Sequence, residues 1–157
     1  MSNSVLKRLF SNETIKVNAT DGKVTIAQSA EVFESWLDPD FKNWNLDNFQ
    51  ASTKEMPVEA YEVVKDADFK TMLGSLNEDL DKLCLTQSQI VDFCKNYKDR
   101  LNPNWGTFFL FKEGSRYFVA FVYVYSVGLF VYVHHFEYAF VWLAGYAHRL
   151  VVPQLEA

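Results

Sequence analysis

The chain has 157 residues, of which 49% are hydrophobic and 22% are charged, a composition typical of a single globular domain. Its formal net charge of -5 argues against a protein that binds a nucleic-acid backbone, because such binding needs a surplus of Lys and Arg. We therefore expect one domain, residues 1–157, with no nucleic-acid partner.

The N-terminal residues 1–12 carry no clear pattern of secondary structure, so we expect a flexible or helical arm there. Residues 1–8 also lack the apolar run of a secretory signal. The first clear element is a β-hairpin of residues 14–19 and 23–27, joined through Asp21 and Gly22. An Asp-Gly pair tolerates the positive φ angles of a tight hairpin turn, and the flanking residues alternate between apolar and polar.

A short helix is expected after Ser29, which suits a helix N-cap, and it should end before Asp38 and Pro39. Residues 38–56 are typical of a loop, and large aromatic side chains should anchor that loop to the body of the protein. The expected anchors are Phe41, Trp44 and Phe49. Residues 58–64 are interpreted as a strand because of their Val and Tyr content.

Two helices are expected in the middle of the chain. The first covers residues 67–73 and ends at Gly74, and the second begins at Thr86, where Gln89 completes a capping box. One apolar stripe of the second helix should face the core and includes Ile90, Cys94, Tyr97 and Leu101.

The two cysteines of the sequence, Cys84 and Cys94, match no redox or zinc motif in their spacing. We therefore expect both thiols to be reduced and the protein to reside in the cytoplasm.

From Gly106 onward the pattern indicates strands, at residues 107–112, 117–125, 129–136 and 149–152. Residues 117–136 contain no formally charged side chain and are long enough to span a bilayer. Their Val, Phe and Tyr content, with Ser126, Val127 and Gly128 in the middle, favours two strands and a turn, so no membrane partner is expected. The predicted fold class is α+β, with the hairpin and two to three helices packed on a C-terminal antiparallel β-meander rich in aromatic residues.

Several stretches of the sequence are similar to a family of short uncharacterised bacterial proteins, mostly from uncultivated organisms. The similar stretches are residues 61–66, 74–76, 83–90, 107–112 and 148–155, and the likeness extends from about Thr14 to the C-terminus. The resemblance implies a bacterial source and no particular activity.

The turn after Tyr125 decides which side chains of the two long strands share a face, because a shift of one residue moves a side-chain set to the other face. A two-residue turn pairs Tyr123 with Tyr132 and forms a platform on one face. The platform then consists of Phe121, Tyr123, Tyr125, Phe130, Tyr132 and His134. A three-residue turn pairs Tyr123 with Val131 and gives ordinary sheet packing; we favour it, because Val127 poorly suits a tight turn.

The function that we expect is that of a non-catalytic binding or protein-interaction domain. The partner would be another protein, a second copy in a homo-oligomer, or a small apolar ligand, and no cofactor is expected. The candidate binding residues are Tyr123, Tyr125, Tyr132, His134 and Trp142. They belong to the aromatic-rich part of the chain, since 16 of its 26 Phe, Tyr and Trp residues lie between Trp105 and Tyr146.

The alternative is a small hydrolase-like or metal-dependent enzyme that uses His134 or His135 with Glu137. Adjacent residues of a regular strand point to opposite faces, so His134 and His135 should not bind one metal ion together. The sequence contains no Walker A motif, dinucleotide glycine series, G-x-S-x-G or H-E-x-x-H. No catalytic residue and no metal ligand is therefore assigned.

Overall fold

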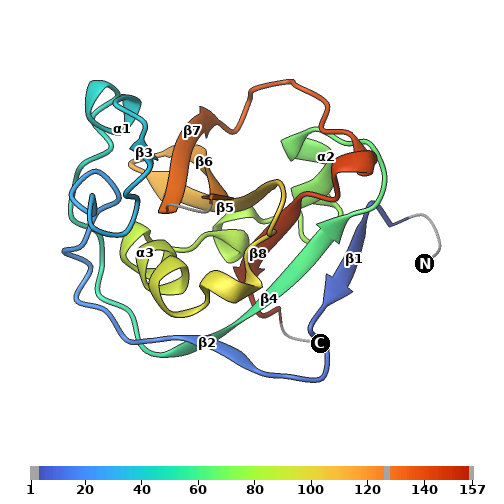
Figure 1. The fold of residues 1–157 in the computed structure, drawn as a ribbon, viewed down its shortest axis with the longest axis horizontal. Coiled ribbons are helices and arrows are strands. Elements are labelled where there is room, and N and C mark those ends of the chain that lie inside the picture. The colour runs from blue at the N-terminus through green and yellow to red at the C-terminus, as the bar shows by residue number, and fades with distance from the viewer. Residues whose placement is uncertain (1–3, 126–127, 156–157) are drawn as a thin grey trace.

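The structure is a computed structural model, and it describes residues 4–125 and 128–155. Its central element is a mixed sheet, which contains eight strands among the described residues, in the order β1-β4-β8-β5-β6-β7-β3 with β2 beside β4 (Figure 1). The strands are β1 (Leu6–Leu9), β2 (Ile15–Val17), β3 (Trp36–Leu37), β4 (Met56–Val63), β5 (Gly106–Glu113), β6 (Arg116–Tyr125), β7 (Gly128–His135) and β8 (Arg149–Pro153). The helices are α1 (Asp40–Asn43), α2 (Phe69–Gly74) and α3 (Gln87–Asn96), and the 3-10 turns are η1 (Leu80–Leu83), η2 (Lys98–Arg100) and η3 (Ala144–Tyr146).

Both faces of the sheet are covered, as is seen from β5, which is buried along most of its length. Phe109 points to the face that carries α3, whereas its neighbour Phe108 points to the opposite face, which carries α2. A run of apolar residues without alternation is typical of a strand that is buried on both faces. The fold is therefore of mixed α and β type, with one hydrophobic cluster on each face of the sheet.

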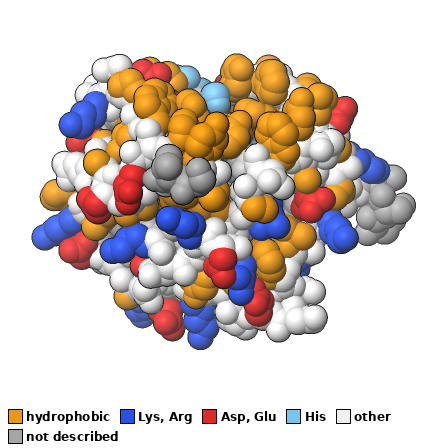
Figure 2. Space-filling model, in the orientation of Figure 1, with side chains coloured by type: hydrophobic (Ala, Val, Ile, Leu, Met, Phe, Trp, Pro, Cys, Tyr) orange, Lys and Arg blue, Asp and Glu red, His pale blue; other side chains and the backbone are white. Residues whose placement is uncertain are grey.

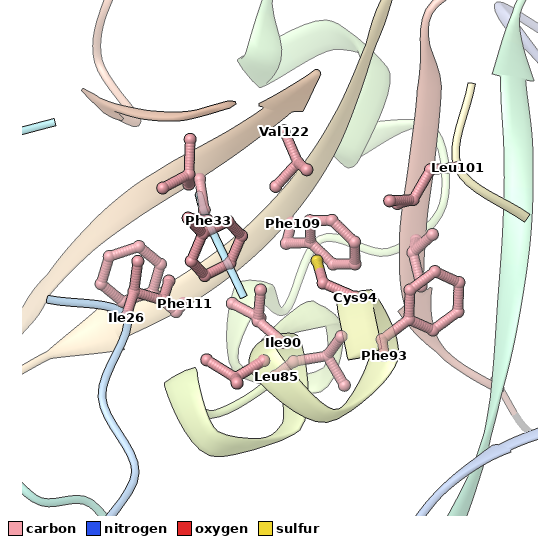
Figure 3. Close-up of a cluster of buried hydrophobic side chains, with 14 of the residues drawn as sticks. Ile26, Phe33, Leu85, Ile90, Phe93, Cys94, Leu101, Phe109, Phe111 and Val122 are labelled. Atoms are coloured by element: carbon pink, nitrogen blue, oxygen red, sulfur yellow. The ribbon is translucent and has the colours of Figure 1, made fainter. Parts of the chain in front are cut away.

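The cluster on the α3 face is assembled from segments that lie far apart in the chain. Figure 3 shows Phe93 and Cys94 of α3 with Phe109 and Val122 of the sheet, together with Phe33 from the N-terminal third. The rings of Phe93 and Phe109 meet edge to face, with their centroids 5.5 Å apart. Burial raises the pKa of the Cys94 thiol above its usual range, so the predicted core role of this cysteine is confirmed.

The capping box that was predicted at the start of α3 is present. The Thr86 hydroxyl oxygen accepts a hydrogen bond from the Gln89 backbone N–H at 3.2 Å. In return, the Gln89 side-chain oxygen accepts one from the Thr86 backbone N–H at 2.9 Å. The helix ends at Asn96, so Tyr97 and Leu101 lie beyond it and the predicted stripe is too long. η2 then carries the chain to Leu101, which is nevertheless buried.

Replacement of Thr86 by alanine is expected to lower the free energy of unfolding by about 0.5–2 kcal/mol, because one helix N–H loses its acceptor. The measurement is a urea titration followed by circular dichroism. Thr86→Ser is the control, since it retains the hydroxyl group and should keep most of the stability. Equal stability of Thr86→Ala and the parent would mean that this cap contributes nothing.

The helix predicted over residues 67–73 is confirmed by α2, and the strand predicted over residues 58–64 is confirmed by β4. The three consecutive strands β5, β6 and β7 form the predicted antiparallel meander. The uncharged run of residues 117–136 therefore lies mainly in two paired strands. No helix in residues 4–125 and 128–155 is long and apolar enough to cross a membrane.

The last strand does not extend the meander, and this part of the prediction is wrong. β8 lies between β4 and β5, antiparallel to β4 and parallel to β5, so the sheet is mixed rather than purely antiparallel. Its side chains are buried on both faces: Val151 joins the α3-side cluster, and Leu150 and Val152 join the other. A strand this apolar needs cover on both faces, and the centre of the sheet supplies it.

The hairpin predicted over residues 14–27 is also wrong. β2 pairs with β4, because this longer strand gives it a ladder partner on the edge of the sheet. Gly22 has the expected positive φ of 79°, yet its carbonyl accepts a hydrogen bond from the Gln50 N–H at 2.9 Å. Residues 23–27 then reach α3, where the Ile26 N–H donates to the Gln87 side-chain oxygen at 3.0 Å.

The helix predicted after Ser29 is replaced by consecutive turns and the short strand β3. The Ser29 hydroxyl does not cap a helix; it donates to the carbonyl of Thr25 at 2.6 Å. β3 pairs in parallel with β7, and the Asp38 N–H donates to the Val131 carbonyl at 3.0 Å. Pairing with the edge of β7 supplies the backbone hydrogen bonds that a helix would have supplied.

Two further predictions about the N-terminal half need correction. Within the expected arm of residues 1–12, residues 6–9 form β1, which pairs with β4 along its outer edge, whereas residues 1–3 lie outside the described part of the chain. Of the three expected loop anchors, Phe41 is fully buried and Trp44 packs against the core, but Phe49 is 63% exposed. A large exposed side chain at this position has no packing role.

Candidate functional site

The pairing of β6 with β7 differs from both registers that the sequence suggested. Tyr125 pairs with Gly128 and Tyr123 pairs with Phe130, so the favoured pairing of Tyr123 with Val131 is wrong. Gly128 belongs to the strand rather than to the turn, and residues 126–127 lie outside the described part of the chain. The register that a two-residue turn predicted pairs Tyr123 with Tyr132, two positions away from the observed partner. A shift of two positions leaves every side chain on the face that this register predicted.

The side chains of the predicted platform therefore do share one face of the sheet, whereas Phe118 of β6 lies on the other face. Phe121 lies opposite Tyr132, with ring centroids 6.5 Å apart, and Tyr123 contacts both Phe121 and Tyr132. This is the face that carries α2. The structure therefore contains the shared face that the platform register predicted, although Phe121 on that face is buried.

The segment 136–147, which follows β7, crosses this face and adds a second layer of aromatic rings. It is fixed at Trp142, whose backbone N–H donates to the Ala67 carbonyl at 2.8 Å and whose carbonyl accepts from the Ala67 N–H at 3.1 Å. The Trp142 ring is almost fully buried and meets Phe121 edge to face, with a centroid distance of 5.0 Å. Sheet and segment together form what we call the aromatic groove.

The aromatic groove consists of two adjoining hollows. The first has a volume of about 310 Å³ and is lined by Phe121, Tyr123, Tyr132, His134, Tyr138, Phe140 and Trp142. The second has a volume of about 280 Å³ and is lined by Trp105, Tyr123, Phe140, Trp142, Leu143, Tyr146 and His148. Because Tyr123, Phe140 and Trp142 line both, the hollows form one continuous surface.

The outer rings of the groove are open to solvent. Phe140 is 48% exposed, and Tyr138, Tyr146 and Trp105 are each exposed by more than 40%. Figure 2 shows hydrophobic side chains gathered along the upper side of the molecule, where Figure 1 places β7 and the segment that follows it. A contiguous exposed apolar patch of this kind usually marks a binding surface.

Stacked rings give the first hollow a defined wall. His134 and Tyr138 are nearly parallel, with an interplanar angle of 6° and a centroid distance of 4.8 Å. Tyr138 and Phe140 are also nearly parallel, at 7° and 5.8 Å. In the second hollow, the ring centroids of Trp105 and Tyr146 lie 4.4 Å apart. Such contacts hold exposed rings in place before a ligand arrives.

The floor of the groove depends on a glycine in β5. A Cβ atom built on Gly106 would lie 1.4 Å from the Cε1 atom of Phe121, so the Phe121 ring occupies the space that a side chain would need. Gly106 pairs with Tyr123 in the sheet. A glycine in a strand often marks a close approach of this kind, and here it leaves room for the Phe121 ring, which lines the first hollow.

The lining side chains carry no carboxylate, amide, lysine or arginine group. Burial lowers the pKa of His148 to about 4, and burial also lowers the pKa of His134 below its ordinary value. Desolvation disfavours the charged form of an imidazole, so His148 is neutral at pH 7. The groove is therefore an uncharged surface on an acidic protein.

Two buried polar atoms in the groove have no hydrogen-bond partner among the described residues. They are Nε1 of Trp142 and Nδ1 of His148, and the two rings lie 5.3 Å apart. Buried polar groups are nearly always hydrogen-bonded, so each such exception needs an explanation. Both rings line the second hollow.

The residues of the alternative enzyme hypothesis are not brought together. His134 faces the groove, whereas His135 lies on the opposite face, stacks on Trp44 at 4.3 Å and contacts Arg116 through Nδ1 at 3.1 Å. Glu137 is exposed and lines a separate small hollow. Among the described residues, no group of three or more His, Cys, Asp and Glu side chains could hold a metal ion.

Four of the five predicted binding residues meet in the groove: Tyr123, Tyr132, His134 and Trp142. Tyr125 is 59% exposed and contacts Phe130 beyond the edge of the groove. The sequence reasoning missed several lining residues, namely Trp105, Tyr138, Phe140, Tyr146 and His148. A signal for part of this set was present, because aromatic residues recur at every second position from 136 to 142.

Comparison of the chain with known protein families, with curated proteins and with solved structures found no match. The resemblance to a family of short bacterial proteins stays a prediction, and any function must be argued from the groove itself.

Proposed function

We propose that the protein is a non-catalytic interaction domain that binds an uncharged segment of a partner protein in the aromatic groove. The observation that carries this proposal is the exposure of the lining rings. Phe140 and Tyr138 lie open to solvent while stacked contacts hold them in place. Aromatic residues of this kind dominate the binding energy of protein interfaces, because they bury a large area with few rotatable bonds.

The open shape of the groove favours a protein partner over a small ligand. A small-molecule site usually encloses most of its ligand in a concave cavity. Here the rims of both hollows are formed by rings that remain over 40% exposed, among them Trp105 and Tyr146. A partner chain that lies across both hollows can cover these exposed rings, whereas a small molecule bound in one hollow would leave most of them exposed.

Two other functions, nucleic-acid binding and catalysis, have less support. A nucleic acid needs Lys or Arg beside its phosphates, and the lining has neither. The alternative of an enzyme that uses His134 or His135 with Glu137 has less support, because Glu137 lines a separate hollow that neither histidine lines.

A matched pair of variants tests the proposal. Phe140→Ala removes a half-exposed ring of the groove, and Phe49→Ala removes an exposed ring that does not line it. Peptides selected from a random display library on the parent protein should bind Phe140→Ala at least roughly tenfold more weakly, a loss of about 1.4 kcal/mol, and should bind Phe49→Ala as they bind the parent. Fluorescence titration measures both affinities.

Two results would contradict the proposal. One is a library that yields no binding peptide, and the other is a set of selected peptides that bind both variants equally well. Sedimentation velocity on the parent and on Phe140→Ala identifies the remaining occupant: a dimer that Phe140→Ala dissociates would mean that a second copy of this chain covers the groove.

A further inference from the structure

We propose that the segment bound by the aromatic groove is rich in proline and adopts the polyproline II conformation. This inference rests on the proposed function and specifies its ligand. The structural basis is the combination of two adjoining aromatic hollows with a lining that offers hydrogen-bond donors and no charge.

The first argument is hydrogen-bond complementarity. The indole N–H groups of Trp105 and Trp142 can only donate, and the hydroxyl groups of Tyr123, Tyr138 and Tyr146 can donate to any acceptor placed beside them. Among the lining side chains only the Tyr hydroxyls and the imidazoles can accept from a ligand N–H, and no carboxylate or amide oxygen is present. A proline-rich segment suits this surface, because each proline keeps its carbonyl acceptor and lacks the N–H donor.

The unpartnered atoms in the second hollow point to the same ligand. Nε1 of Trp142 is buried without an acceptor among the described residues. The Trp142 ring lines the second hollow, so a ligand carbonyl bound there can reach this N–H once neighbouring side chains rearrange, and such rearrangements are common when interfaces form.

The absence of charge in the lining narrows the ligand further. Proline rings are apolar and flat, so they stack on aromatic faces without leaving a buried charge unpaired. His148 is neutral at pH 7 because burial lowers its pKa to about 4. An acidic or basic peptide would lose hydration in the groove and gain no counter-charge, whereas a proline-rich peptide has no charge to desolvate.

Two adjoining hollows suit a ligand with a regular repeat, such as the polyproline II helix. That helix has three residues per turn and rises about 3.1 Å per residue, so the same side of the chain returns about every 9 Å. Phe140 and Trp142 stand between the hollows and line both. One extended ligand can therefore contact both hollows, and a preformed helix loses little entropy on binding.

The test uses blocked synthetic peptides and the indole N–H signals of the protein in NMR spectra. The first peptide consists of four Ala-Pro-Pro repeats, the second has each proline replaced by alanine, and the third is an amphipathic helical peptide rich in leucine. The Ala-Pro-Pro peptide should shift the indole signals of Trp105 and Trp142 and bind at least about tenfold more tightly than the other two. Phe140→Ala should abolish these shifts, and Phe49→Ala should preserve them.

The possible failures separate the two proposals. If the leucine-rich peptide, or library peptides without proline, bind the groove better than the Ala-Pro-Pro peptide, the interaction function stands and the inference about proline is overturned. If the Ala-Pro-Pro peptide leaves the indole signals unmoved, the inference is overturned whatever the library selection yields. The backbone spectrum of Phe140→Ala must match that of the parent outside the groove, which shows that the variant is folded.

Discussion

Replacement of Phe109 by alanine is expected to lower the free energy of unfolding by about 3–5 kcal/mol. Phe109 lies in β5 with no exposed surface, and its ring packs against Phe93 of α3 at a centroid distance of 5.5 Å. Truncation removes the buried ring and leaves a cavity that the paired strands on both sides of β5 cannot close. Urea unfolding followed by circular dichroism measures the loss.

Phe49→Ala is the control for this prediction as well, because Phe49 is 63% exposed and its truncation should change stability by no more than about 0.5 kcal/mol. Both variants remove the same side chain, so the difference between them reports burial alone. If Phe109→Ala unfolds at the same urea concentration as Phe49→Ala, the α3-side cluster is not the core of the protein.

Acid is expected to destabilise the protein through His148. Burial lowers the pKa of this imidazole to about 4 in the folded state, whereas an exposed histidine in the unfolded chain titrates near 6.5. The unfolded state therefore binds a proton first as the pH falls. The contribution of His148 to the free energy of unfolding should be fully present above about pH 6.5 and should fall between about pH 6.5 and 4. The total loss from this group should be about 3 kcal/mol.

His148→Phe isolates this contribution. A phenylalanine ring fits a site that is already surrounded by Phe108, Phe121 and Trp142, and it removes both the proton and the unpartnered Nδ1 atom. The free energy of unfolding of the variant should depend less on pH between about 6.5 and 4 than that of the parent. Part of the pH dependence that remains should come from His134, whose pKa is also lowered by burial. Parallel stability curves for the parent and the variant would show that His148 does not titrate in this range.

Features that depend on local chemistry could be predicted from the sequence. The capping box at Thr86 involves residues three positions apart, and the strands β5, β6 and β7 follow one another with short turns. The hairpin at Asp21 and Gly22 failed although its turn chemistry was sound, since Gly22 has the expected positive φ. The outcome was decided by β4, a strand more than thirty residues away, which competes for the same backbone groups.

The groove could be predicted only in part, for a similar reason. The candidates in β6 and β7 were correct because a strand fixes which side chains share a face, yet the favoured register was wrong because the turn rules assumed that Gly128 lies in the turn. Residues such as Phe140 and His148 escaped notice because they reach the groove from a segment with no regular secondary structure and from a position just before β8. Their placement depends on tertiary contacts such as the pairing of Trp142 with Ala67.

The central position of β8 has a consequence for the newly made chain on the ribosome. β4 and β5 are each ready to pair long before β8 is synthesised, but neither can bond to the other, because the strand that joins them is the last of the sheet. Until residues 149–153 emerge, β4 and β5 of the nascent protein each carry an unpaired edge, and unpaired strand edges are prone to pair with other chains. Translation of the final strand, rather than of any helix, is thus the event that closes the sheet and ends this period of exposure.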